Sequence, residues 1–148
     1  MSIKNLRTMT GMPVAMCALA WKESNGVLDK AIEILKTKGL LKAKKLQDRA
    51  TSGGGYIGMY RHHTAKVCST VSLLCETESV SNLAVFRVMA DEIAMHLATL
   101  EEIPETPKEF LEQELLFTRG VTIEEHMAQL SARVGEKIEL GAMTLTRI

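Results

Sequence analysis

The chain has 148 residues, and its 18 basic and 18 acidic side chains cancel to a formal net charge of zero. Hydrophobic residues make up 46% of the sequence and charged residues 24%, a composition that is typical of a globular protein and excludes wholesale disorder. Zero net charge argues against a protein that coats nucleic acid, because such proteins neutralise many phosphates with Lys and Arg.

The charges are unevenly distributed along the chain. Residues 1–74 carry 12 Lys+Arg and 4 Asp+Glu, a balance of +8, whereas residues 75–148 carry 6 and 14, a balance of −8. This asymmetry indicates either two surfaces with separate functions or two solvated faces that attract each other in the fold. Both interpretations stay open from the sequence.

The cysteine count and the N-terminus bear on the compartment. Cys17, Cys68 and Cys75 form no Cys-x-x-Cys pair and no disulfide framework, which is typical of a reducing compartment. Residues 1–7 lack the apolar centre of a signal peptide, and no stretch reaches the roughly 20 apolar residues of a membrane span. We therefore expect a cytoplasmic protein of a bacterial-type cytosol, with an organelle matrix or a virus-infected bacterial cell as open alternatives.

The first forty residues predict three short helices. The first is expected to end near Thr8, the second to run from Pro13 to about Ser24, and the third to end at Gly39. The third helix has one apolar stripe at i, i+3, i+4 and i+7: Leu28, Ala31, Ile32 and Leu35. Residues 40–55 then predict a basic, helix-compatible linker whose glycine run is either a hinge or the lead-in to a strand.

Residues 56–148 predict a small sheet with helices. The strands are expected at Tyr56–Tyr60, at the alternating segment Val67–Cys75 and at Lys137–Ile148. A helix is expected from about residue 83 to 100, with an apolar stripe of Phe86, Met89, Ile93 and Leu97. Further helices are expected over 108–117 and after Thr122, where Glu125 completes a capping box. The fold class is therefore α+β, with a three-stranded antiparallel sheet.

The side chains with reactive chemistry form no persuasive site. We expect Cys17 to be a small buried thiol rather than a nucleophile. The spacing of His62 and His63 from Cys68 and Cys75 matches no usual zinc pattern, and the two cysteines are expected on opposite faces of one strand. We expect no metal and no cofactor. The acidic run over residues 101–114 is expected to form a solvated face: Glu101, Glu102, Glu105, Glu109, Glu112 and Glu114.

Several segments are specific when they are taken together and in order. The N-terminal ones are Leu6–Gly11, Cys17, Asn25-Gly26 and Lys30–Ile32, and the later ones are Leu74–Val80, Ile93–Ala98 and Val134–Ile138. In this order they resemble the motifs of elongation factor Ts, the family of guanine-nucleotide exchange factors for the GTPase elongation factor Tu. The resemblance spans nearly the whole chain.

The resemblance implies a domain plan and two contact segments. A UBA-like three-helix domain would cover residues 1–39, a linker 40–55 and a core 56–148. The N-terminal docking edge on elongation factor Tu would consist of Arg7, Thr10, Gly11, Val14 and Ala15. The segment that disrupts the nucleotide site would consist of Thr77, Glu78, Ser79 and Val80. Such a protein is not an enzyme, because it promotes release of GDP and magnesium by binding rather than by covalent chemistry.

The sequence departs from the family pattern within both segments. Glu78 and Ser79 replace the usual Asp-Phe, while Pro13-Val14-Ala15 replaces the usual Gly-Met-Met. Either the partner has changed accordingly or exchange is reduced. The alternative function is a non-catalytic module that binds elongation factor Tu as a scaffold or complex subunit. From local sequence alone, Thr77 is also expected to cap the helix that follows it.

The chain shows one core repeat where longer family members have two. Short members of the family act as homodimers, and a three-stranded sheet leaves edges and one face that dimerisation would bury. The resemblance therefore implies a homodimer through the core sheet, with elongation factor Tu as the other partner and no direct contact with nucleic acid or membrane.

Overall fold

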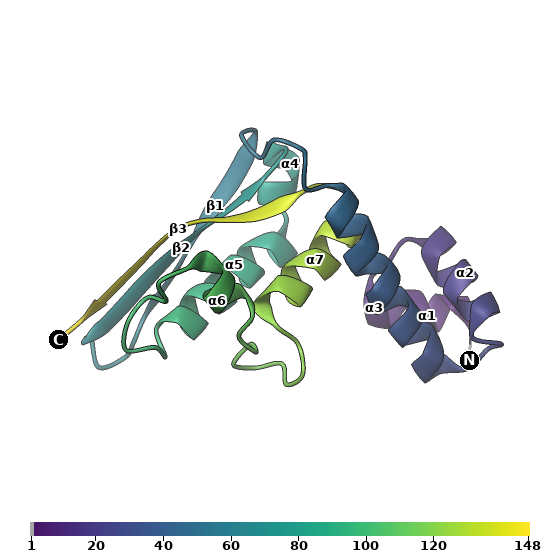
Figure 1. The fold of residues 1–148 in the computed structure, drawn as a ribbon, viewed down its shortest axis with the longest axis horizontal. Coiled ribbons are helices and arrows are strands. Elements are labelled where there is room, and N and C mark those ends of the chain that lie inside the picture. The colour runs from purple at the N-terminus through teal and green to yellow at the C-terminus, as the bar shows by residue number, and fades with distance from the viewer. Residues whose placement is uncertain (1) are drawn as a thin grey trace.

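The computed structural model describes residues 2–148, so the first residue of the predicted N-terminal domain lies outside it. Figure 1 shows an α+β arrangement, as predicted: a three-stranded antiparallel sheet in the order β1–β2–β3, helices along one side of it, and a group of N-terminal helices at one end. No helix among the described residues is long and apolar enough to cross a membrane.

The N-terminal part consists of three helices: α1 (Ile3–Thr10), α2 (Val14–Glu23) and α3 (Leu28–Lys45). Helix α1 extends two residues beyond the predicted end because Gly11 terminates it. Gly11 adopts the left-handed conformation at φ 64°, and its N–H donates to the carbonyl of Arg7 over 2.7 Å. Pro13 then precedes α2, which begins where the sequence predicts.

The predicted end of the third helix at Gly39 is wrong, because α3 continues to Lys45. Gly39 is buried, and a Cβ there would lie 3.0 Å from the Met12 methyl carbon and 3.6 Å from the Cβ of Ala132. The glycine therefore allows α3 to approach its neighbours closely instead of breaking the helix. This packing outweighs the roughly 1 kcal/mol by which glycine disfavours a helix interior relative to alanine.

Helix α3 ties the N-terminal helices to the core. It packs along α7 (Ile123–Val134), and Lys42 Nζ donates to the Ala132 carbonyl over 2.9 Å. Ala132 also belongs to the apolar cluster beneath the N-terminal helices: Leu6, Met12, Cys17, Ala20, Ala31, Leu35 and Ala132. The chain between α3 and β1 is therefore short, residues 46–53, and Gly54 and Gly55 of the predicted glycine run already belong to the first strand.

The sheet consists of β1 (Gly54–Arg61), β2 (Val67–Cys75) and β3 (Ile138–Arg147). The predicted alternation along β2 is confirmed. Ser69, Val71, Leu73 and Cys75 are buried, whereas Cys68 on the other face is exposed. Gly58 lets β1 lie against α5 (Ala84–Leu97), because a Cβ at Gly58 would overlap the Ala90 carbonyl.

Helices cover only one face of the sheet (Figure 1). The stripe predicted on α5 is buried as expected: Phe86, Met89, Ile93 and Leu97. The capping box of α7 is also confirmed, with Thr122 Oγ1 and the Glu125 carboxylate each accepting the other residue's N–H. The helix predicted over 108–117 is wrong in extent, because α6 spans only Pro107–Leu111 and a loop follows it.

Candidate partner-binding site

The predicted docking edge lies where α1 turns into α2. Thr10 shapes this turn, since its hydroxyl donates to the Leu6 carbonyl over 2.8 Å and accepts the Met12 N–H over 3.3 Å. Gly11 has the positive φ that the turn requires, and a Cβ there would collide with the Arg133 side chain. Thr10 and Gly11 thus form the turn itself, which connects α1 to α2 beside α7.

The surface of this edge combines a charged side chain with apolar ones. Val14 is 50% exposed, Arg7 and Ala15 are exposed, and Thr10 is half-buried. Two further large apolar side chains on the same two helices are exposed, Met9 of α1 at 62% and Leu19 of α2 at 54%. Exposed apolar side chains that gather on one surface mark a site of protein–protein contact.

The second predicted segment forms a turn directly after β2. The strand ends at buried Cys75, Thr77 occupies the N-cap position, and a single helical turn, α4 (Glu78–Ser81), follows. Glu78 and Ser79 are exposed. Val80 is only 7% exposed and belongs to the main core cluster, so its side chain attaches the turn to the core.

The Thr77 side chain does not cap α4 as the sequence predicts. No side-chain cap bond forms there, because Thr77 Oγ1 donates instead to Glu136 Oε1 over 2.6 Å, and the Thr77 N–H donates to Glu136 Oε2 over 3.0 Å. The segment Val134–Ile138 therefore lies against the segment Leu74–Val80. Two motifs that are about sixty residues apart in this sequence meet at one corner of the fold.

The Cys75 thiol beneath this corner is structural. Burial raises its pKa, and the nearby carboxylates of Glu136 and Glu76 raise it further. The neutral thiol donates to the Thr77 carbonyl over 3.1 Å. Cys17 is fully buried as well, which confirms the expectation of a small apolar thiol. Across residues 2–148 no three His, Cys, Asp or Glu side chains cluster as a metal site would require.

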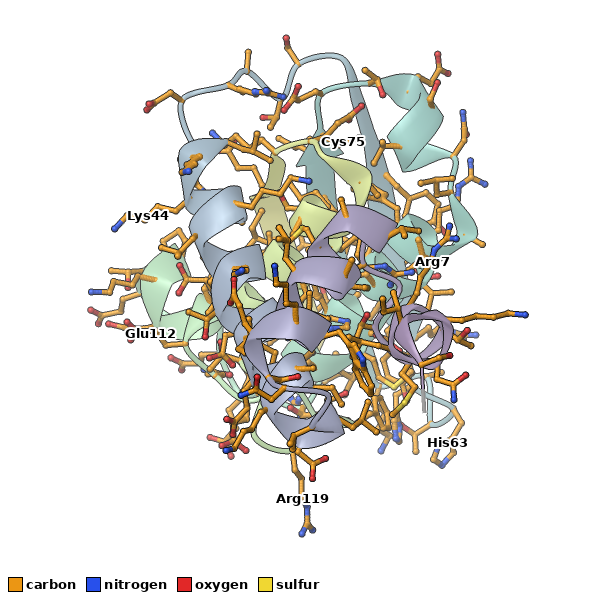
Figure 2. The ribbon with its side chains drawn as sticks, turned by 90° about the vertical axis from the view of Figure 1, so that its right-hand side faces the viewer. Arg7, Lys44, His63, Cys75, Glu112 and Arg119 are labelled. Atoms are coloured by element: carbon orange, nitrogen blue, oxygen red, sulfur yellow. The ribbon has the colours of Figure 1, made fainter. Side chains whose placement is uncertain are left out.

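The structure does not merge the two predicted segments into one site. Figure 1 shows α1 and α2 beside the first half of α3, whereas α4 lies near the other end of that helix. Figure 2 likewise shows Cys75, at the end of β2, well away from Arg7 on α1. A single partner that touched both segments would have to span this length of the molecule.

Sequence reasoning missed the contacts that hold both segments. The approach of α3 to α7 at Gly39 had a signal in the small residues Gly39 and Ala43, spaced four apart on one helix face. The hydrogen bonds to Glu136 had no local signal, because the two partners are joined only by the closing of the sheet.

Comparison with known proteins supports the resemblance. No family model matches the chain. A protein named elongation factor Ts from Fervidobacterium nodosum is 32% identical, and the alignment covers 99% of this chain and 95% of that protein. The chain belongs to the elongation factor Ts family. A second member, from Petrotoga mobilis, is 32% identical over 92% of this chain and 90% of its own length.

This chain is shorter than its relatives. The alignment with the Fervidobacterium protein runs over 189 positions, although the chain has 148 residues, so that relative contains segments without a counterpart here. Against elongation factor Ts of Aquifex aeolicus, which is 36% identical, the chain spans only 48% of the relative's length.

Proposed function

We propose that this chain is a guanine-nucleotide exchange factor for elongation factor Tu that promotes release of GDP during translation elongation. One observation carries the proposal: membership of the elongation factor Ts family extends along nearly the whole chain, including the segment that forms the turn at Glu78 and Ser79. The protein acts by binding, and GDP and the factor weaken each other's affinity for the GTPase reciprocally.

The geometry supports a two-point mode of binding. The N-terminal edge of Arg7, Thr10, Gly11, Val14 and Ala15 would bind the partner, while Glu78 and Ser79 would contact its nucleotide site. Thr77 and Val80 hold that turn, since one is hydrogen-bonded to Glu136 and the other is buried in the core. Residues 1–39, 40–55 and 56–148 would then act as a UBA-like docking domain, a linker and a core, with the linker beginning inside α3 and ending inside β1.

The test is release of a fluorescent GDP analogue from elongation factor Tu on addition of this protein. We expect release to accelerate with protein concentration and then to saturate. No acceleration at saturating protein would refute the proposal. Retained binding in a pull-down without release would favour the non-catalytic module instead. Both measurements use the intact chain.

We also propose that the chain pairs with a second copy through the open face of its sheet. Tyr56 and Tyr60 pack against the core, so the alternating residues between them face away from the helices. These residues, Ile57 and Met59, are 61% and 66% exposed. Burying them against the same face of a second copy would remove apolar surface from water.

Light scattering at micromolar concentration tests the pairing. We expect a mass of twice 16.3 kDa, and a stable mass near 16.3 kDa would refute it. The substitution Met59→Lys should return the protein to a monomer. Met9→Lys is the matched control, because Met9 is equally exposed but lies on α1, away from the sheet.

A further inference from the structure

Glu136 and Glu76 exchange hydrogen bonds between two segments that are distant in the sequence. Glu136 accepts both the N–H and the hydroxyl of Thr77, and Glu76 Oε1 accepts the N–H of Lys137 over 2.7 Å. Each carboxylate thus holds the backbone of the opposite segment. We name this arrangement the Glu76–Glu136 clamp.

From this geometry we infer that Glu136 is a positioning residue for nucleotide exchange, which fixes the turn at Glu78 and Ser79 by holding Thr77. The inference rests on the proposed function, since it assigns a supporting residue to the same contact segment. Glu136 itself need not touch the partner.

The clamp binds the residue that immediately precedes the exposed turn. Thr77 directly precedes Glu78, and the peptide bond between them is planar. Fixing the orientation of Thr77 therefore also restricts the orientation of the exposed Glu78. Both oxygens of the Glu136 carboxylate accept hydrogen bonds from Thr77. Two bonds to one residue restrict its rotation as well as its distance from Glu136. Hydrogen bonds to an ionised acceptor are shorter and stronger than neutral ones.

Glu136 is itself held in place. Its backbone carbonyl accepts the Ser131 hydroxyl over 2.6 Å, which ties it to the last turn of α7. Arg49 also donates hydrogen bonds to the Glu76 carboxylate and to the Gly135 carbonyl, each over 3.4 Å. The clamp is therefore braced by a helix and by the segment that leads into β1.

Gly53 and Gly54 allow the backbone that leads into β1 to lie close against the backbone of Glu76 and Thr77. A Cβ on Gly53 would overlap the Glu76 carbonyl, and one on Gly54 would overlap the Thr77 carbonyl. With Val80 buried beneath, the turn is supported by the clamp, by the glycine backbone and by the core. Such preorganisation favours binding, because fewer degrees of freedom are lost when the partner docks.

The experiment compares Glu136→Ala and Thr77→Val with the unsubstituted chain in GDP release from elongation factor Tu. We expect the maximal release rate at saturating factor to fall about tenfold, the loss expected for one charged hydrogen bond. The concentration at half-saturation should change much less, because the N-terminal edge still grips the partner. Glu136→Gln keeps one acceptor oxygen and should restore part of the rate.

Hydrogen exchange at single amides reports the clamp without reference to activity. Glu136→Ala should speed exchange of the Thr77 amide, whereas Glu76→Ala should speed exchange of the Lys137 amide. Glu105→Ala, at an exposed glutamate before α6, is the control and should change neither amide nor the release rate. Circular dichroism confirms that each variant is folded.

The outcomes separate the two proposals. If the unsubstituted chain accelerates release and Glu136→Ala does so equally well, the positioning role is overturned while the proposed function stands. A rise in the concentration at half-saturation alone, with an unchanged maximal rate, also overturns it. If the unsubstituted chain releases no GDP, the proposed function fails and the positioning role fails with it.

Discussion

The two proposed contact regions of this molecule are held by different forces. The edge between α1 and α2 packs on a small apolar cluster that includes Ala132 of α7. The turn at Glu78 and Ser79 rests on carboxylate hydrogen bonds, on glycine backbone and on the edge of the main core. Packing tolerates small changes of shape, whereas a polar clamp depends on single atoms, so substitutions should affect the two regions differently.

The largest effect is expected for Phe86→Ala, because Phe86 belongs to the core cluster that also contains Val80 of the turn. Phe86 is fully buried, and such truncations cost about 3–5 kcal/mol because a cavity remains. Urea denaturation followed by circular dichroism measures the loss. Phe117→Ala is the control, since Phe117 is 63% exposed and its truncation should cost less than about 0.5 kcal/mol.

Leu35→Ala tests whether the N-terminal helices unfold separately from the core. Leu35 is 1% exposed, and we expect a loss of about 2–4 kcal/mol in the free energy of unfolding. Because Ala132 of α7 belongs to the same cluster, unfolding should remain one transition. Two resolved transitions would show that the N-terminal helices are an independent unit. Leu41→Ala, at an exposed position on α3, should have little effect.

Ser79→Phe restores at the turn the aromatic residue typical of the family. If the missing ring matters, the rate of GDP release should rise about tenfold, equivalent to about 1.4 kcal/mol. An unchanged rate would show that this departure has no consequence for exchange. The control is Thr118→Phe, which places the same ring at an exposed position in the loop between α6 and α7.

Val14→Ala tests the grip of the N-terminal edge. Removing two methyl groups that would be buried on binding should weaken affinity for elongation factor Tu by about fivefold, near 1 kcal/mol. The maximal release rate should stay the same, in contrast to Glu136→Ala. Val27→Ala serves as control, because Val27 is similarly exposed at 45% but precedes α3. Titration calorimetry or surface plasmon resonance would measure both affinities.

The smallest effect concerns the segment between α3 and β1. Thr51 Oγ1 donates to Glu139 Oε2 over 2.6 Å, and this hydrogen bond, with Lys137 nearby, lowers the pKa of Glu139 below its usual 4.5. A lowered folded-state pKa stabilises the fold above pH 4.5, and that contribution is lost as the pH falls through the folded value. Thr51→Val should therefore cost under about 1 kcal/mol at pH 7, because the pair is exposed. The cost should shrink in acid, and an equal cost at pH 3 would refute this assignment.

Local patterns predicted most elements of the fold. The strand Val67–Cys75, the buried stripe of α5 and the capping box of α7 depend on residues within one turn or one strand of each other, so the sequence shows them directly. The error at Gly39 arose where distant packing overrode local propensity. Over residues 108–117, the helix is cut short because residues 113–115 pair instead with residues 121–123, where the Ile123 N–H donates to the Gln113 carbonyl over 3.0 Å. The two contact segments were located from family motifs, but the sequence did not reveal what holds them.

The sequence by itself determined the α+β class, the burial of Cys17, the opposite faces of Cys68 and Cys75, and the order of motifs that places the chain in the elongation factor Ts family. It also showed the +8 and −8 halves, although not their arrangement. Only the tertiary structure decided that α3 docks on α7 through Gly39, and that Glu136 holds Thr77. Both contacts join residues about sixty or more positions apart, and such contacts exist only once the sheet and helices have closed around one core.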